Sequence, residues 1–424
     1  YYSGVIEQIY NRIGKETRNI VMANYSNDFS IEKLEVIRRY QSNEDNVFFA
    51  YSEFSYNTLV GAYEPFLDII CNMHRRFIGG SFDDFQKECG VYYLHRQVLN
   101  SYYETGECFR EETVLLNEVA YEQRRMTMAI VDMLKRLSEV RPLMIVINRF
   151  QMASKSSIET IKYLIDNPCT NIGIVLGVNA LVRGTDSTVE EWDRIVESLE
   201  DRSAIYYIGS AGQLKNNIRD TSDDELYITT NFEQSIQEAS NIMEFLDYEQ
   251  ARRGCRIIEH KIKFEDAWID EKSLRRFYLV YAMTSVLLGE MSKAIELMNE
   301  YKALIPENDS EHYFSLYYFM KGTCYMYQGK LEKAEGCAKK AYDYALLADD
   351  ELLEFRSELL SVMIKMSGWY NIFFCVQDIP VSDEFIEKLI KHGYRNHLAH
   401  IYIYAYDNSR DVVKQSFYDE SLLK

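Results

Sequence analysis

The sequence predicts an α/β domain with an open, mostly parallel sheet, followed by an all-α solenoid. Three observations lead to this fold class. Five short apolar runs alternate with amphipathic stretches before about residue 210. A pattern of residues recurs about every 40 positions in the C-terminal half. The chain of 424 residues holds only 5 prolines and 19 glycines, which favours long helices over a turn-rich β-fold.

Each apolar run in the N-terminal half is bounded by polar residues and is short enough for one strand. Continuous apolar runs of this kind are typical of parallel strands covered by helices on both faces. Strands are predicted at 18–23, 46–54, 142–150, 171–179 and 204–209. Amphipathic helices connect them, and an additional helical segment at about 82–140 precedes the third strand. The first domain is therefore predicted to span 1–210.

The C-terminal half contains an internal repeat. Segments 278–306 and 318–346 superimpose with a shift of 40 residues, which pairs Gly289 with Gly329. Further units are predicted around Gly368 and Asn408, with an atypical one at 242–262. Regular self-similarity of this length is typical of stacked helical repeats. The second domain, a helical linker with repeats, is therefore predicted to span 211–424, and the polar stretch 209–226 forms its boundary.

Charge and cysteine usage restrict the classes of partner. The formal net charge of -19 would repel a phosphate backbone, so we expect no direct nucleic acid binding by this chain. The 8 cysteines are scattered without a C-x-x-C motif, which indicates reduced thiols in a cytoplasmic protein. No run reaches the roughly 18 consecutive apolar residues of a spanning helix. We therefore expect no membrane association.

Histidine and cysteine are not spaced as metal ligands. Cys71 and His74 share a helical face, but no second pair supplies the remaining ligands, so packing is the expected role. His392, His397 and His400 are expected at the surface of the last repeat. The sequence therefore predicts no metal site.

The repeat units resemble tetratricopeptide repeats, in which a glycine turn follows the first helix and a small residue on the second helix permits close packing. In the second unit the matching residues are Gly322, Tyr325, Gly329, Ala334 and Ala341. The spacing of about 40 residues is longer than the 34 of the standard repeat. The resemblance implies a solenoid that binds a protein or peptide.

The layout of the whole chain resembles the signal-transduction ATPases with numerous domains (STAND), as found in bacterial regulators of the maltose-activator and LuxR type. Segments "YYSGVIEQIYNRI", "YEPFLDII" and "PLMIVINRFQMASKSSIETIKYLI" are similar to the family's opening helix, the segment after its second strand, and its magnesium-binding strand. The resemblance implies a P-loop NTPase-like fold (AAA ATPase-like), a role in signal transduction or transcription regulation, and oligomerisation through the α/β domain. An effector domain beyond Lys424 is a further expectation.

The phosphate-binding loop of such a fold is altered in this sequence. A P-loop needs glycines and a lysine between the first strand and its helix. Gly14 and Lys15 precede the first strand, where they are expected to end a helix. At the corresponding loop positions the chain has Asp28, Phe29 and Ser30. The sequence therefore predicts that the phosphate cradle is degenerate.

The magnesium site is altered as well. The family places acidic residues after the third strand, where this chain has Asn148 and Arg149. Arginine repels a cation and asparagine is a weak neutral ligand, so hydrolysis is not expected. Arg149 and Arg183 could contact an anion or form surface salt bridges. The chain is thus predicted to be a pseudo-ATPase without enzyme activity and without ATP or another cofactor.

The function predicted from these features is that of a non-catalytic signalling scaffold with a partner-binding repeat surface. The partner-binding residues predicted on the first helix of each unit are Arg276, Leu279, Met283, Phe319, Thr323, Tyr327, Lys365 and Tyr402. Burial of several of these against neighbouring repeats is the alternative. An ATP-binding or ATP-hydrolysing switch with a rearranged phosphate site, and a plain adaptor, are alternative functions.

Overall fold

A computed structural model gives the fold of most of the chain. It describes residues 2–25, 35–42, 46–55, 59–110, 112, 114, 116–179, 189–208, 232–264, 269–308, 310–370 and 381–408. The chain divides into two compact units. The first comprises Tyr1–Phe109 and Asn117–Ala267, and the second comprises Arg110–Leu116 and Trp268–Lys424.

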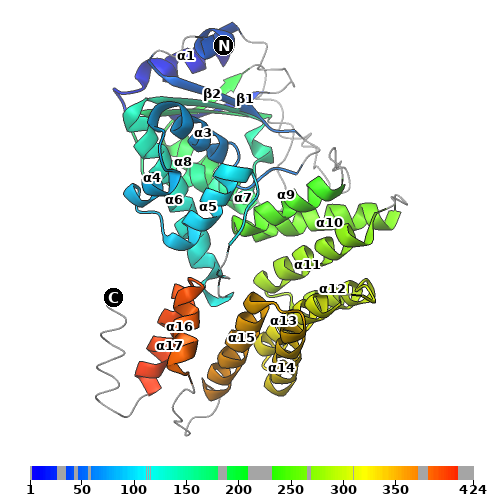
Figure 1. The fold of residues 1–424 in the computed structure, drawn as a ribbon. Coiled ribbons are helices and arrows are strands. Elements are labelled where there is room, and N and C mark those ends of the chain that lie inside the picture. The colour runs from blue at the N-terminus through cyan, green and yellow to red at the C-terminus, as the bar shows by residue number, and fades with distance from the viewer. Residues whose placement is uncertain are drawn as a thin grey trace. The chain divides into compact units, whose positions relative to one another are not determined.

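The first unit is built on a parallel sheet of five strands in the order β2-β3-β4-β1-β5 (Figure 1). The strands are β1 (Ile20–Tyr25), β2 (Phe48–Glu53), β3 (Leu143–Asn148), β4 (Ile172–Asn179) and β5 (Ile205–Ile208). Every residue of β3 and β4 is buried, as the continuous apolar runs require. The predicted fold class, a parallel α/β sheet followed by helical repeats, is confirmed.

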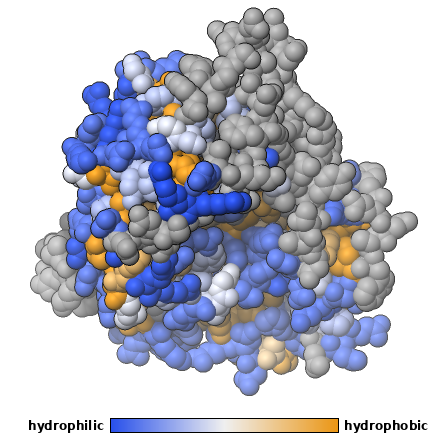
Figure 2. Space-filling view, turned by 90° about the horizontal axis from the view of Figure 1, so that it is seen from above, coloured by the Kyte–Doolittle hydropathy of each residue, from blue (hydrophilic) through white to orange (hydrophobic). Residues whose placement is uncertain are grey.

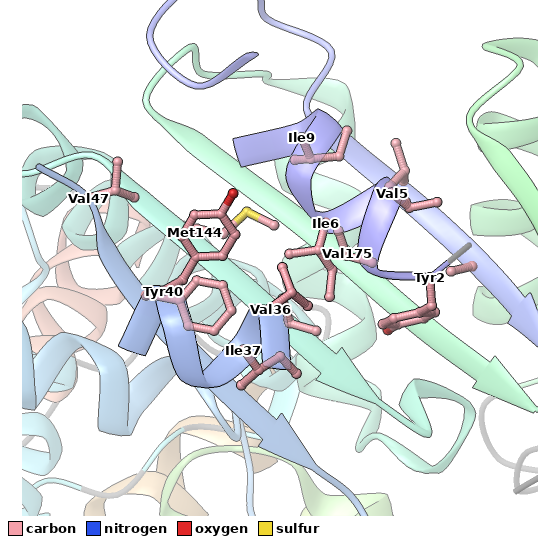
Figure 3. Close-up of a cluster of buried hydrophobic side chains, with 14 of the residues drawn as sticks. Tyr2, Val5, Ile6, Ile9, Val36, Ile37, Tyr40, Val47, Met144 and Val175 are labelled. Carbon is pink, nitrogen blue, oxygen red and sulfur yellow. The ribbon is translucent and has the colours of Figure 1, made fainter. Parts of the chain in front are cut away.

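One face of the sheet is covered by α1 (Tyr2–Arg12) and α2 (Glu35–Ser42). Figure 3 shows their apolar side chains lying over the strands, with Ile6 beside Val175. Residues of β1 at every second position belong to this cluster, because side chains alternate between the two faces of a strand. Tyr10 of α1 also stacks on Tyr40 of α2 at a ring-centroid distance of 4.0 Å.

The remaining helices of the first unit lie in the connections and after the sheet. A helical segment precedes β3, as predicted: α3 (Phe66–Met73), the π-helix η2 (His74–Ile78), α4 (Phe82–Glu88), α5 (Tyr93–Thr105), the 3-10 turn η3 (Leu116–Glu118) and α6 (Val119–Val140). After β3 follow the 3-10 turn η4 (Phe150–Met152), α7 (Lys155–Asp166), α8 (Val189–Asp201), α9 (Phe232–Glu244) and α10 (Tyr248–Phe264). The first unit thus includes α9 and α10, beyond the predicted boundary. That boundary, 209–226, lies outside the described residues.

The second unit is a series of antiparallel helices. They are α11 (Glu271–Leu287), α12 (Met291–Ala303), α13 (Glu311–Tyr327), α14 (Leu331–Leu347), α15 (Glu351–Tyr370), α16 (Asp383–Lys391) and α17 (Arg395–Asn408). Gly289 and Gly329 have φ of 77° and 70°, a left-handed conformation that glycine adopts without strain at a helix end. Gly368 lies inside α15 instead of at a turn.

Small residues let the repeat helices approach closely. Ala334, Ala338 and Ala341 of α14 are fully buried. A Cβ at Gly322 of α13 would lie 2.9 Å from Cδ2 of Leu360 in α15. The spacing of small residues in the sequence therefore has a packing function, as the repeat pattern indicates.

Candidate functional site

The carboxyl edge of the sheet is the first candidate site. The chain leaves β1 for β2 at one end of the sheet and leaves β4 for β5 at the other, and β1 and β4 are neighbours. In open α/β sheets, ligands bind outside the carboxyl ends of the strands where connections diverge in this way. The side chains that end these strands are therefore candidates for contact with a ligand.

A buried hydrogen bond joins the ends of β1 and β3. The Tyr25 hydroxyl donates to Oδ1 of Asn148 at 2.6 Å, and both residues are almost fully buried. Tyr2 of α1 reaches the same place: a Cβ on Gly177 would lie 2.7 Å from the Tyr2 hydroxyl and 3.0 Å from Oδ1 of Asn148. Burial raises the pKa of Tyr2 well above its usual value, so its phenol is neutral. The side chains of Tyr2 and Tyr25 therefore occupy space at this edge of the sheet.

Arg149 forms an ion pair beside this hydrogen bond. Its backbone is left-handed, with φ of 55°, and its guanidinium lies 3.2 Å from a carboxylate oxygen of Glu53 at the end of β2. NH1 of Arg149 also donates to the carbonyl of Phe54 at 3.3 Å. The other carboxylate oxygen of Glu53 accepts from the Tyr51 hydroxyl at 2.7 Å. Arg149 thus forms a salt bridge, which is one of the two roles predicted for it from the sequence, the other being contact with an anion.

The described side chains at this edge are poorly suited to magnesium chemistry. Oδ1 of Asn148 already accepts a hydrogen bond, and the Glu53 carboxylate is neutralised by Arg149. Within the described ranges, no group of three or more His, Cys, Asp or Glu side chains could hold a metal ion. The predicted phosphate-loop positions Asp28, Phe29 and Ser30, and Arg183, lie outside the described residues. Those predictions stay untested.

Two buried amide donors remain at the edge. Nδ2 of Asn148 and Nε2 of Gln151 are buried and have no hydrogen-bond partner among the described residues. Gln151 follows β3, and its Oε1 accepts from the backbone N–H of Asn179 at 3.4 Å. Such donors can bond to water or to a polar ligand.

Substitution of Tyr25 by phenylalanine is expected to lower the free energy of unfolding by about 1–3 kcal/mol, because Oδ1 of Asn148 would be left buried without its donor. Urea denaturation followed by circular dichroism measures the change. Tyr163→Phe on α7, where the side chain is half-buried, is the matched control and should change stability by less than about 0.5 kcal/mol. Equal effects of both substitutions would contradict a stabilising role for the Tyr25–Asn148 bond.

The predicted partner-binding residues lie on alternate helices of the second unit. Arg276, Leu279 and Met283 are half-buried on α11, and Phe319 and Thr323 are half-buried on α13. Tyr327 at the end of α13 is 38% exposed. Lys365 of α15 is exposed and Tyr402 of α17 is half-buried. The set thus occupies the first helix of each pair, as the register predicts, but whether it binds a partner stays a prediction.

Packing accounts for part of this set. Phe319 lies against the buried cluster of Met326, Ala334, Ala338, Leu360 and Ile364. The Thr323 hydroxyl donates to the carbonyl of Phe319 at 3.0 Å within α13. These two residues therefore contribute to the contact between α13 and its neighbours, whereas Tyr327 and Lys365 are accessible.

One pair of residues in the second unit was missed by the sequence reasoning. Glu112 is fully buried, and its Oε1 accepts from the backbone N–H of His397 at 2.9 Å and lies 2.8 Å from Nδ1 of the same residue. The prediction that His397 lies at the surface is wrong, since it is 3% exposed. Nothing in the sequence indicates the pairing, because the two residues are 285 positions apart.

In Figure 2 most of the coloured residues are hydrophilic, and the hydrophobic ones among them form several separate patches. Among the described helices, none has the length and apolarity needed to cross a membrane. The described cysteines, Cys71, Cys89, Cys108, Cys169, Cys255, Cys324 and Cys337, are free.

Fold and site together define the class of protein as a parallel α/β unit joined to a unit of helical repeats. Compared with known proteins, the chain matches no family model, no curated protein and no solved structure.

Proposed function

We propose that the chain is a non-catalytic signalling scaffold, a degenerate STAND-like module whose helical repeats bind a protein or peptide. The observation that carries the proposal is the carboxyl edge of the sheet. Tyr25 and Asn148 bond to each other there, and Arg149 neutralises Glu53. A site that hydrolyses a nucleotide needs carboxylates available to a magnesium ion and room for phosphates. The described edge offers a neutral amide and two bulky phenols instead.

The repeat unit supports the binding half of the proposal. Stacked helix pairs form an extended surface, and accessible aromatic and cationic side chains such as Tyr327 and Lys365 suit a peptide or helix ligand. Free cysteines agree with a cytoplasmic location. A role in transcription regulation and assembly through the α/β unit are parts of the proposal that follow from the STAND-like layout.

Titration with a fluorescent ATP analogue tests the proposal. The full chain, with and without magnesium, is expected to show no magnesium-dependent binding at micromolar concentrations of analogue, and no phosphate release. Asn148→Asp and Arg149→Ala are informative variants, since both remove the groups that disfavour a cation. Tight magnesium-dependent binding by the unmodified chain would overturn the scaffold proposal.

An ATP-binding switch is the second candidate. Nδ2 of Asn148 and Nε2 of Gln151 favour it, because they are buried donors at the edge where a ligand of this fold would lie. Binding without magnesium dependence, weakened by Gln151→Leu, would support this candidate over the scaffold.

A further inference from the structure

A short segment of the chain leaves the first unit to join the second. Residues Arg110–Leu116 belong to the second unit, while the residues before and after them belong to the first. Arg110, Glu112 and Val114, at every second position, are 7%, 0% and 9% exposed. Burial of a charged side chain and an apolar one on this short stretch shows that it packs against the second unit.

Glu112 is the anchor of this segment on α17. The first backbone N–H groups of a helix have no partner within the helix and attract a negative charge. The residue before α17 is Tyr394, whose hydroxyl accepts from Nε of Arg356 at 2.9 Å. The Glu112 carboxylate accepts the free N–H of His397 in the first turn of α17, so it caps a helix 285 residues away.

The groups that receive Glu112 are held in place by packing. The His397 ring lies 5.3 Å from the Tyr394 ring, and Tyr394 packs edge-on against Phe355 of α15. Phe355 and Tyr394 belong to the buried cluster that joins α15, α16 and α17. A rigid acceptor site loses little conformational entropy when a ligand binds.

A second contact fixes the other end of the segment. The backbone N–H of Leu116 donates to the Tyr327 hydroxyl of α13 at 3.4 Å. Tyr327 is among the residues predicted from the sequence to bind a partner. The segment therefore bonds to the second unit through both a side-chain carboxylate and a backbone group.

We propose that Tyr327 and the first turn of α17 form a binding site for an acidic peptide, and that Arg110–Leu116 occupies this site as an intrachain ligand. The partner carries a glutamate or aspartate with apolar residues two and four positions later, as Glu112, Val114 and Leu116 do. Arg395, the exposed first residue of α17, puts a positive charge in the same helical turn, which favours an acidic ligand. The inference rests on the proposed function and names the site and ligand class of the repeat surface.

The test uses a fluorescein-labelled peptide of residues 108–118 with serine in place of the cysteine, measured by fluorescence polarisation against the full chain. With an intrachain ligand, the apparent affinity for an added one is the intrinsic affinity multiplied by the fraction of chains whose site is free. The Glu112→Ala chain is therefore expected to bind the peptide at least about tenfold more tightly than the unmodified chain. A peptide carrying Glu112→Ala should bind the same variant at least about tenfold more weakly.

Controls separate binding from folding. Glu107→Ala removes an exposed carboxylate three residues before the segment and should leave the affinity for the peptide unchanged. Circular dichroism checks that each variant is folded, and Glu112→Gln, whose amide oxygen can still accept the His397 N–H, serves if Glu112→Ala unfolds. A folded variant that binds the peptide no more tightly than the unmodified chain overturns the inference. Unfolding of both variants overturns it too, since the segment would then be an obligatory part of the fold.

The nucleotide titration distinguishes a failure of the acidic-peptide site from a failure of the proposed scaffold function. Failure of peptide binding, with no magnesium-dependent nucleotide binding, removes the acidic-peptide site and leaves the scaffold proposal standing. Magnesium-dependent nucleotide binding removes the scaffold proposal whatever the peptide does.

Discussion

Replacing Glu122 by alanine is expected to lower the free energy of unfolding of the first unit by about 3–5 kcal/mol. Glu122 of α6 is 1% exposed. Its carboxylate oxygens lie 3.0 Å from Nε2 of the fully buried His95 of α5 and 3.2 Å from NH1 of Arg125. Removing the carboxylate leaves the Arg125 guanidinium and the buried His95 imidazole without their negative neighbour in a site with little water. Urea denaturation monitored by circular dichroism measures the loss.

The same substitution should alter the pH dependence of stability. Burial raises the pKa of Glu122, but His95 and Arg125 outweigh burial and lower the pKa below its usual value of 4.5. A carboxyl group whose pKa is lower in the folded state contributes stability above the unfolded pKa and loses it as the pH falls through the folded value. The unmodified chain should therefore lose stability below about pH 4.5 more steeply than Glu122→Ala.

Glu139→Ala on the same helix is the matched control. Its side chain is 60% exposed and pairs with Arg136, so the change should be less than about 1 kcal/mol. The double substitution His95→Leu with Glu122→Leu should recover most of the loss, because it removes both partners of the buried pair. A loss for Glu122→Ala no larger than for Glu139→Ala would contradict the interpretation.

Replacing Phe355 by alanine is expected to lower the stability of the second unit by about 3–5 kcal/mol, since it leaves a cavity among α15, α16 and α17. Phe355 is 2% exposed and lies at ring-centroid distances of 4.5 Å from His392 and 5.0 Å from Tyr394. Hydrogen exchange measured by mass spectrometry should show loss of protection across α16 and α17. The thermal unfolding midpoint of this unit should fall with it.

Ile390→Ala is the control for this prediction. Ile390 lies on α16, but its side chain is 61% exposed, so its removal should change stability by less than about 0.5 kcal/mol. Faster exchange in α16 and α17 that is equal for both variants would show that the helices are not held by the Phe355 cluster.

The strands and the repeat helices could be predicted because each depends on a local pattern. All five predicted strands are present, and the continuous apolar runs become β3 and β4, which are buried on both faces. The turns at Gly289 and Gly329 were predicted from the repeat and have the positive φ that glycine tolerates. Gly368 shows the limit of that pattern, because it lies inside α15 although glycine favours a helix end.

The sequence by itself determined that the chain forms a parallel α/β sheet followed by helical repeats, and that an amide and a guanidinium, Asn148 and Arg149, stand at the end of β3. Periodicity, turn residues and residue identity are local properties. Only the tertiary structure decided that Asn148 bonds to Tyr25, that Arg149 pairs with Glu53, and that Glu112 caps α17 at His397. The residues in these three contacts are 123, 96 and 285 positions apart in the sequence. The path of the backbone decides which residues meet, because a buried polar group needs a partner that is near it in space.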